Sequence, residues 1–413
     1  MEGLLLGMTR VKWLLCLACL LSGSVLAQDY EIQYKVTVAP ESGLARVAIE
    51  LRGERLPSRL VFSLDPQRHL HVSSKQPLET DRRGRTVWRP AAPQASLQYD
   101  FVVDEQKDAN SYDSLMVEDW AVLRGDKLIP AVAVTAPKGL KSQAELLLYL
   151  PDGWSAAAPY AELEPGSTAA RYRLMDPGRS FIRPKGWMML GKIASRQDIV
   201  AGVEVRVAAP RGQQVRLLDT LTFLSWTLPQ IKAVFGTFPE RLLIVSADDP
   251  MWRGGLSGTR SLFMHADRPL VSGNRTSSLI HELVHVGTGI HGDRSSDWIV
   301  EGLAEYYAVE ILHRTGGISE ERFQQTLDEL ADWGDASDKL LTGDSSGATT
   351  ARAVGVMVEV DREIRRATDD RASLDDVAAA LAAQRGEVTV KGFIDLAESI
   401  AGKKLSALSG LIH

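Results

Sequence analysis

The pattern of apolar residues changes near residue 210 and divides the chain into two parts. Over residues 30–39, apolar side chains occupy every second position, which is the period of a half-buried β-strand. Turns rich in Pro, Gly, Asp and Ser separate this segment from further strand candidates at 45–51, 59–64, 97–103, 144–150 and 203–208. We therefore expect residues 28–210 to form an antiparallel β-sandwich-like domain.

Residues 211–413 follow a helical period instead. The first helix is expected over 217–235, with Pro229 kinking or dividing it. A short buried strand (241–246), a glycine-rich loop (252–260) and a second strand (261–265) follow it. Further helices are expected at 320–333, 351–366, 374–383 and 391–401. The predicted fold class is α+β, in which a mostly helical second domain carries a small edge sheet.

Two histidines four residues apart mark the centre of the second domain. His281 and His285 belong to the motif H-E-x-x-H, and residues at this spacing lie on one face of a helix. Both imidazoles can therefore bind one zinc ion. Glu282 lies about 100° round the helix, where its carboxylate can take a proton from a metal-bound water. The neighbouring residues are mostly apolar, and a buried helix is a costly place for such groups unless something pairs them.

A second polar pair follows on another predicted helix, at about 296–315. Glu301 and Glu305 are four residues apart and share one face. One of them can be the third zinc ligand, and the other can accept the free N–H of a zinc-bound imidazole. His291 is the competing third ligand, as in the pattern H-E-x-x-H-x-x-G-x-x-H. That pattern requires glycine where this chain has Thr288.

These motifs resemble a known family of zinc peptidases. The sequence H-E-L-V-H followed by W-I-V-E-G-L-A-E-Y-Y is similar to the gluzincins and, among them, to the glycyl aminopeptidase-like family. The resemblance covers about residues 215–413 and implies a thermolysin-like catalytic domain. It makes Glu301 the third ligand and Glu305 the acidic residue behind a ligand. Shorter matches at 150–154 and 176–178 extend it into the β-rich part.

Two expected residues of this family are missing. Gly254, Gly255 and Leu256, which we expect to bind substrate, match the start of a G-G-L-E-H-like or G-A-M-E-N-like motif. In gluzincins this loop precedes an edge strand that binds the substrate backbone, and the corresponding strand here is 261–265. Ser257 replaces the glutamate that grips a free amine there, which argues against aminopeptidase specificity. The family's oxyanion-stabilising tyrosine is also missing at 350–353, and losing one such donor costs about 10²–10³ in rate. The residues that could replace it are Tyr307, His313 and Arg352.

Composition and the first residues narrow the class of protein. The chain has 413 residues, 45% of them hydrophobic, and its net charge of −6 argues against nucleic acid as a partner. Basic residues, an apolar run too short to span a bilayer, and small residues up to Ala27 predict a signal peptide over 1–27. Cys16 and Cys19 lie inside it, so the mature chain would have no thiol, and the sequence before Cys19 fits a lipoprotein signal poorly. We expect a periplasmic or secreted protein without an integral membrane segment.

The sequence thus predicts an exported metallopeptidase with one zinc ion per chain and a peptide or protein substrate. His281, His285 and Glu301 would bind the metal, and Glu282 would act as general base. The first alternative is a homologue that binds zinc, is weak or inactive as a catalyst, and captures polypeptides in the cell envelope. The second alternative is a structural β-domain protein in which the H-E-x-x-H motif is accidental. The substrate, the choice between endo- and exopeptidase, and the oligomeric state stay open.

Overall fold

The computed structural model describes residues 29–410, except for 166, 168, 177, 178, 342 and 344. The predicted signal peptide and both cysteines lie outside the described residues, and so does part of the family match at 176–178. Export therefore stays a prediction. Among the described helices, we find none with the length and apolar character that a membrane crossing requires.

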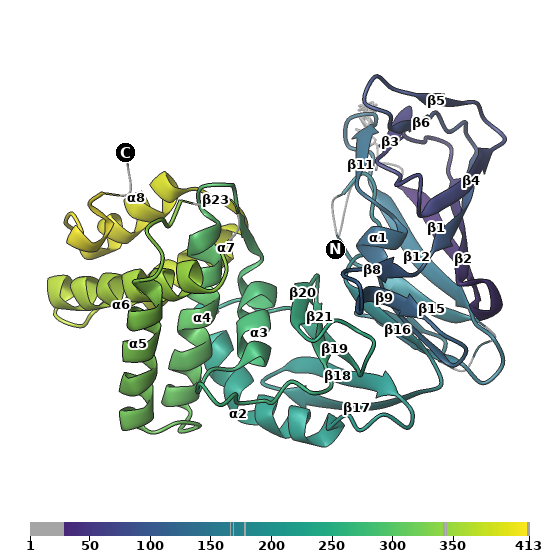
Figure 1. Ribbon diagram of the computed structural model, residues 1–413. Coiled ribbons are helices and arrows are strands. Elements are labelled where there is room, and N and C mark those ends of the chain that lie inside the picture. Colours follow the sequence, from purple (N-terminus) through teal and green to yellow (C-terminus); the bar gives the residue numbers. More distant parts are fainter. Residues whose placement is uncertain are drawn as a thin grey trace, which may run out of the picture.

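The N-terminal part consists of β-sheets, which lie on one side of the molecule in Figure 1. Its largest sheet has, in order, β14 (Ala161–Leu163), β15 (Ala170–Leu174), β12 (Ser142–Tyr149), β1 (Tyr30–Ala39), β2 (Leu44–Arg52), β7 (Gln94–Val102) and β4 (His69–Ser74). A second has β13 (Ser155–Ala157), β16 (Trp187–Gly191), β10 (Trp120–Arg124), β9 (Tyr112–Met116) and β8 (Glu105–Gln106). A third has β11 (Val132–Thr135), β3 (Arg59–Phe62), β6 (Thr86–Trp88) and β5 (Leu78–Thr80).

The first two sheets pack face to face, as the alternation in β1 predicts. Tyr34 and Val36 of β1 are buried in the same hydrophobic cluster as Leu123 of β10 and Met188 of β16. One pairing differs from the antiparallel prediction, because β1 and β12 run parallel. Parallel neighbours need a long crossover connection. Here the connection contains strands β2 to β11, which explains why local sequence could not show the pairing.

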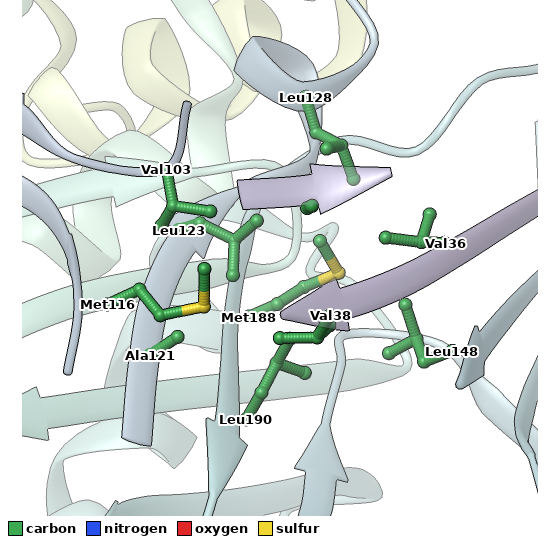
Figure 2. A pocket seen from close by; sticks show the side chains of 11 residues that line it. Val36, Val38, Val103, Met116, Ala121, Leu123, Leu128, Leu148, Met188 and Leu190 are labelled. Atoms are coloured by element: carbon green, nitrogen blue, oxygen red, sulfur yellow. The ribbon is translucent and has the colours of Figure 1, made fainter. Parts of the chain in front are cut away.

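A small cavity remains between the two sheets (Figure 2). Its volume is about 10 Å³, and only apolar side chains line it, among them Val38, Met116, Met188 and Leu190. A buried water needs several polar partners, which this wall does not offer. The cavity is therefore a packing void and no ligand site.

A fourth sheet connects the two parts of the chain. Its strand order is β17 (Ile193–Val200), β18 (Val203–Pro210), β19 (Arg241–Ala247), β21 (Ser261–His265) and β20 (Gly255–Gly258). Strand β18 pairs with β19 in parallel, so the predicted boundary between residues 210 and 211 falls inside one sheet. The sheet is consequently larger than the small edge sheet that the sequence predicts. The expected edge strand, 261–265, is β21 and lies inside the sheet between β19 and β20. The edge is β20, which is formed by part of the predicted glycine-rich loop and pairs on one side with β21.

Helices cover the rest of the C-terminal part (Figure 1). They are α2 (Leu217–Phe235), α3 (Ser278–Thr288), α4 (Asp297–Arg314), α5 (Glu320–Gly334), α6 (Ala348–Thr368), α7 (Leu374–Gln384) and α8 (Val390–Ala401). The four-residue helix α1 (Gly125–Leu128) lies in the N-terminal part, and β22 (Ile290–Gly292) pairs with β23 (Gly386–Val388). Pro229 lies inside α2 without dividing it. Helices α3 and α4 pack side by side at the centre and carry the candidate site.

The close crossing of α4 and α6 depends on Gly302. A Cβ atom at this position would lie 2.7 Å from the Ala353 Cβ atom of α6. We expect Gly302→Ala to lower the free energy of unfolding by about 1–3 kcal/mol, the usual cost of overpacking. Adding Ala353→Gly removes the clash, so in urea unfolding the double variant should be more stable than the two separate changes predict. Strictly additive effects would contradict the steric explanation.

Candidate metal centre

Helix α3 orients the two histidines. It begins after Ser277, whose hydroxyl accepts a hydrogen bond from the Ile280 N–H at 3.3 Å, and ends at Gly289, which has a φ of 58°. Its apolar residues are buried in the main hydrophobic cluster of the C-terminal part. Because this packing determines the rotation of the helix, His281 and His285 face α4 together.

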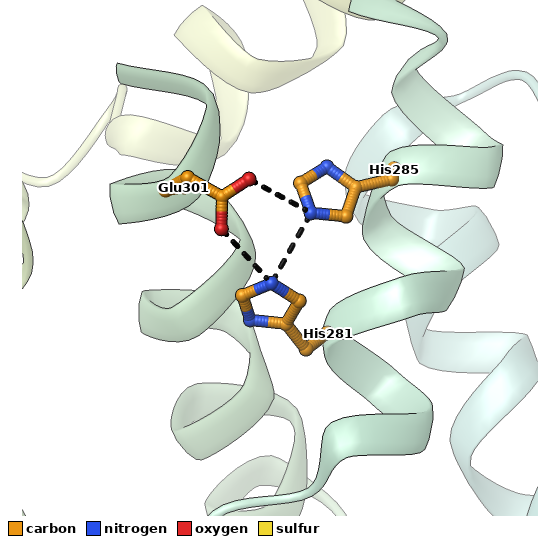
Figure 3. Close-up of side chains that lie close together, drawn as sticks. All are labelled: His281, His285 and Glu301. Carbon is orange, nitrogen blue, oxygen red and sulfur yellow. Dashed lines mark hydrogen bonds and ion pairs between the residues drawn. The ribbon is translucent and has the colours of Figure 1, made fainter. Parts of the chain in front are cut away.

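Glu301 of α4 faces both imidazoles (Figure 3). Its Oε2 atom lies 3.3 Å from Nε2 of His281, and its Oε1 atom lies 3.5 Å from Nε2 of His285. The two Nε2 atoms are 3.1 Å apart. Ligand atoms arranged tetrahedrally round one zinc ion lie about 3.3–3.5 Å from one another. The three side chains therefore fit a single zinc ion and leave one coordination position for another ligand.

Glu305 determines the orientation of the first imidazole. Its Oε2 atom lies 3.0 Å from Nδ1 of His281. A hydrogen bond donated by Nδ1 leaves the Nε2 lone pair directed at the centre, as in metal sites whose histidines are held by a carboxylate. Glu301 and Glu305 are one helical turn apart on α4, so the same helix supplies both carboxylates.

The electrostatics of the centre favour a positive charge. Burial alone would lower the pKa of His281, but Glu301 and Glu305 together raise it to about 10. Burial and the neighbouring His281 lower the pKa of His285 to about 4, so its imidazole stays neutral and can offer a lone pair. Glu301 and Glu305 thus stabilise a cation at this centre. This agrees with the distances between the ligand atoms of His281, His285 and Glu301.

Glu282 lies beside this centre and next to strand β20. Its side chain is buried, and a Cβ atom on Gly255 would lie 3.2 Å from its Oε1 atom. Burial raises the pKa of Glu282, and the positive charge of His281 and the polar groups of the neighbouring Ser257 act in the opposite direction. Sequence reasoning did not foresee this contact of Ser257. A buried carboxylate with a raised pKa is suited to accept and return a proton.

A large cleft opens over the centre. Its volume is about 1650 Å³, and His281, Glu282, His285 and Glu301 form part of its wall. Pockets for small molecules usually measure about 300–1,000 Å³, so the cleft is large enough for a polypeptide. Gly255 and Leu256 also line it, whereas Gly254 is buried beneath the ring of Trp252.

His291 is not among the three converging side chains. It is exposed on strand β22, and although it lines the cleft, it lies outside the cluster of His281, His285 and Glu301. The ligand atoms of that cluster all lie within 4.8 Å of one another. The geometry therefore favours Glu301 over His291 as third ligand.

The candidates for a replacement oxyanion donor have other partners. Tyr307 is fully buried, and its hydroxyl donates to Oδ1 of Asp375 at 2.9 Å. His313 stacks on Phe323, and Arg352 donates to the carbonyl oxygen of Ser337 at 2.9 Å. None of the three is among the described residues that line the cleft.

A second group of possible metal ligands lies at the ends of β19 and β21. Asp248, Asp249 and His265 approach one another, with Nε2 of His265 3.5 Å from Oδ1 of Asp249. Nδ1 of His265 accepts a hydrogen bond from the Asp267 N–H at 3.2 Å, so in the neutral ring the proton is on Nε2. Arg253 also pairs with Asp249. This group is therefore poorly suited to a metal.

Comparison with solved structures identifies the fold. No family model and no curated protein matches the chain. Among solved structures, an aminopeptidase N family protein from Idiomarina loihiensis matches with a TM-score of 0.63 and 14% identity, over 86% of this chain and 70% of that one. The M1 zinc metallopeptidase from Deinococcus radiodurans matches with a TM-score of 0.57 and 15% identity, over 93% and 92%. The chain has the fold of M1 zinc metallopeptidases.

A variant of the Deinococcus enzyme, bound to a Tyr-Ser-Ala substrate, matches with a TM-score of 0.57, 16% identity and similar coverage, 93% and 92%. At such low identity the M1 likeness establishes architecture alone. It agrees with the predicted gluzincin fold. The chemistry of the site follows from its own side chains.

Proposed function

We propose that this chain is a zinc-dependent metallopeptidase that hydrolyses peptide bonds. The observation that carries the proposal is the convergence of His281, His285 and Glu301 at tetrahedral spacing, with Glu282 buried beside them. In this proposal one zinc ion is bound per chain, and the substrate is a peptide or protein and no nucleic acid. Membership of the glycyl aminopeptidase-like family, which rests on the motifs, belongs to the same proposal.

The roles of the residues follow from their places. When bound, zinc lowers the pKa of a coordinated water and polarises a carbonyl group. Glu282 accepts a proton from the attacking water at its carboxylate and returns it to the leaving amine. Glu305 holds the imidazole of His281 through Nδ1. Burial keeps the carboxylate of Glu282 out of bulk water, which strengthens its interactions in the site.

Strand β20 is suited to bind the substrate backbone. It is the edge strand of its sheet, and the cleft runs along Gly255, Leu256 and Ser257. An extended peptide can add to such an edge by main-chain hydrogen bonds. Because Ser257 is where related aminopeptidases have an amine-binding glutamate, we propose that a free N-terminus is not required.

A specific observation favours the alternative of a zinc-binding protein with little catalysis. Tyr307, His313 and Arg352 all have partners away from the cleft. Without a protein donor for the oxyanion, hydrolysis would be slow by about 10²–10³. Metal analysis of the purified protein, together with an unbiased peptide digest, separates the two functions. Zinc with cleavage supports the peptidase, and zinc with intact bound peptides supports the alternative.

Glu305→Gln should weaken zinc binding by about 10–100-fold, which is the usual effect of removing the carboxylate behind a metal-bound histidine. The change keeps the size of the side chain and removes the charge that orients His281. Competition with a chromophoric chelator would measure the affinity. Glu321→Gln, at an exposed position on α5, is the matched control and should leave the affinity unchanged. Equal affinities for both variants would exclude this role of Glu305.

A further inference from the structure

The cleft walls are basic in a chain that is acidic overall. The net charge is −6, yet outside the metal centre the described cleft residues include seven arginines and lysines against four carboxylates. Several of these cations are neutralised. Arg124 pairs with Asp126 at 2.6 Å, and Arg179 pairs with Asp176 at 3.1 Å. The remainder leaves an excess of positive charge that the mechanism above does not use.

Two of the arginines without an ion pair lie on one wall. In the described part of the chain, neither Arg183 nor Arg260 forms an ion pair with a carboxylate. Arg183 is held by its backbone surroundings, since its Nη1 donates to the carbonyl oxygen of Ile129 at 2.6 Å. Both guanidinium groups interact electrostatically with the hydroxyl of Tyr160, as does the carboxylate of Asp126, which pairs with Arg124. Their positive charges therefore act on the same region of the cleft.

The second arginine is at the tip of the β20–β21 hairpin. Gly258 pairs with Ser261, so Thr259 and Arg260 form the turn, and Arg260 has a left-handed φ of 56°. Tight turns require a positive φ at one or both central residues, so the turn itself accounts for this conformation. Figure 1 places this hairpin between α3 and the N-terminal sheets.

The N-terminal part holds the hairpin in place. The Trp187 N–H donates to Oγ of Ser261 at 2.7 Å, and its indole N–H donates to the carbonyl oxygen of Leu256 at 2.8 Å. A Cβ atom on Gly186 would lie 2.3 Å from the carbonyl oxygen of Thr259, so the contact is close. Arg260 is thus part of a turn that these contacts hold in one conformation, which lowers the entropic cost of binding a ligand.

The β20–β21 hairpin also determines the distance between Arg260 and the metal centre. Gly255 is adjacent to Glu282 at one end of β20, and Gly258 precedes the turn at the other end. At about 3.3 Å per residue, these two glycines are about 10 Å apart along the strand. A peptide that adds to β20 with its scissile bond at Glu282 would bring a residue about three positions away to Arg260.

We propose that Arg183 and Arg260 form a subsite for a carboxylate of the peptide substrate, about three residues from the scissile bond. The inference rests on the proposed peptidase function and specifies its substrate class. The carboxylate belongs to an acidic side chain on the N-terminal side of the scissile bond, because Arg260 lies beyond Ser257, where related aminopeptidases bind a free amine. Guanidinium groups bind carboxylates through charge-assisted hydrogen bonds and discriminate against neutral amides of the same shape.

Binding to the full-length, zinc-loaded Glu282→Gln protein tests the subsite without requiring turnover. Fluorescein-labelled peptides carry either Glu or Gln at each of several successive positions, and anisotropy reports their affinities. At one position, Glu should bind about tenfold more tightly than Gln, which is the size of one partly exposed charge-assisted hydrogen bond. The preference should decrease with added salt. Amidation of the C-terminus is the control for a non-specific charge effect and should leave the preference unchanged.

Variants of the subsite decide the assignment. Arg260→Gln should remove the preference, Arg260→Lys should restore part of it, and Arg260→Glu should favour peptides with lysine at the same position. Arg82→Gln makes the same change of charge at an exposed site in the β5–β6 turn and should have no effect. Equal affinity for Glu and Gln peptides, a preference that survives Arg260→Gln, or no peptide binding at all would overturn the proposal.

A parallel digest with the wild-type protein keeps the two proposals apart. Cleavage of peptides without any acidic preference would refute the subsite and leave the peptidase function standing. Tight binding of acidic peptides without cleavage would support the subsite and refute the peptidase function.

Discussion

Replacing Glu282 with glutamine should lower peptide hydrolysis by about 10²–10⁴-fold, the usual contribution of a general acid–base residue, while zinc content stays unchanged. The amide keeps the size of the side chain but cannot accept the proton of the attacking water. Glu282 is not one of the three possible metal ligands, His281, His285 and Glu301, so the variant should still bind the metal. Turnover of a defined peptide and metal analysis of the same preparation would measure both effects.

Glu282→Asp is an informative companion variant. It keeps the carboxylate but withdraws it by one methylene from its place beside Gly255, so we expect an intermediate rate. Exposed Glu321→Gln serves again as control for the purification and the assay. If Glu282→Gln turned over peptides at the wild-type rate, the role of Glu282 as general base would be untenable.

The parts of the fold that sequence could predict are those with a local periodicity. The alternation in β1 agrees with its observed burial. The i, i+4 spacing of His281 and His285 likewise makes the shared face a local property. Each of these predictions needed only neighbouring residues.

Elements without a local signature were missed. All five residues of β16 (Trp187–Gly191) are buried, so no alternation marks the strand. Strand β20 (Gly255–Gly258) has two glycines and exists because it pairs with β21. The pairing of β18 with β19 joins segments that are separated by helix α2. Period-two patterns identify strands but do not identify their partners.

The contacts of side chains around the site could not be predicted from local sequence either. The sequence offers Tyr307 as a replacement oxyanion donor, but its hydroxyl donates to Asp375 of α7 and Tyr307 does not line the cleft. The contact of Ser257 with Glu282 and the positions of Arg183 and Arg260 depend on how the two parts of the chain pack. The motif at 254–258 marks the position of Ser257 but not its contact with Glu282, and no motif marks Arg183 or Arg260.

Removing the third ligand should have the largest effect on metal binding. We expect Glu301→Ala to weaken zinc binding by more than about a hundredfold, beyond the effect of losing a carboxylate that only supports a ligand. His281 and His285 would remain as two ligands, fewer than catalytic zinc sites use. Activity should fall with the bound metal. Zinc stoichiometry after dialysis against a chelator, with circular dichroism to check folding, would measure the loss.

His291→Ala is the matched variant, because His291 lines the same cleft and is the competing third ligand in the metzincin pattern. The structure leaves it outside the cluster formed with Glu301, so zinc stoichiometry should stay at one per chain. The opposite result, with zinc lost in His291→Ala and kept in Glu301→Ala, would require β22 to move toward α3. It would replace the gluzincin assignment with a three-histidine centre, and Glu305 would then have no reason to lie 3.0 Å from His281.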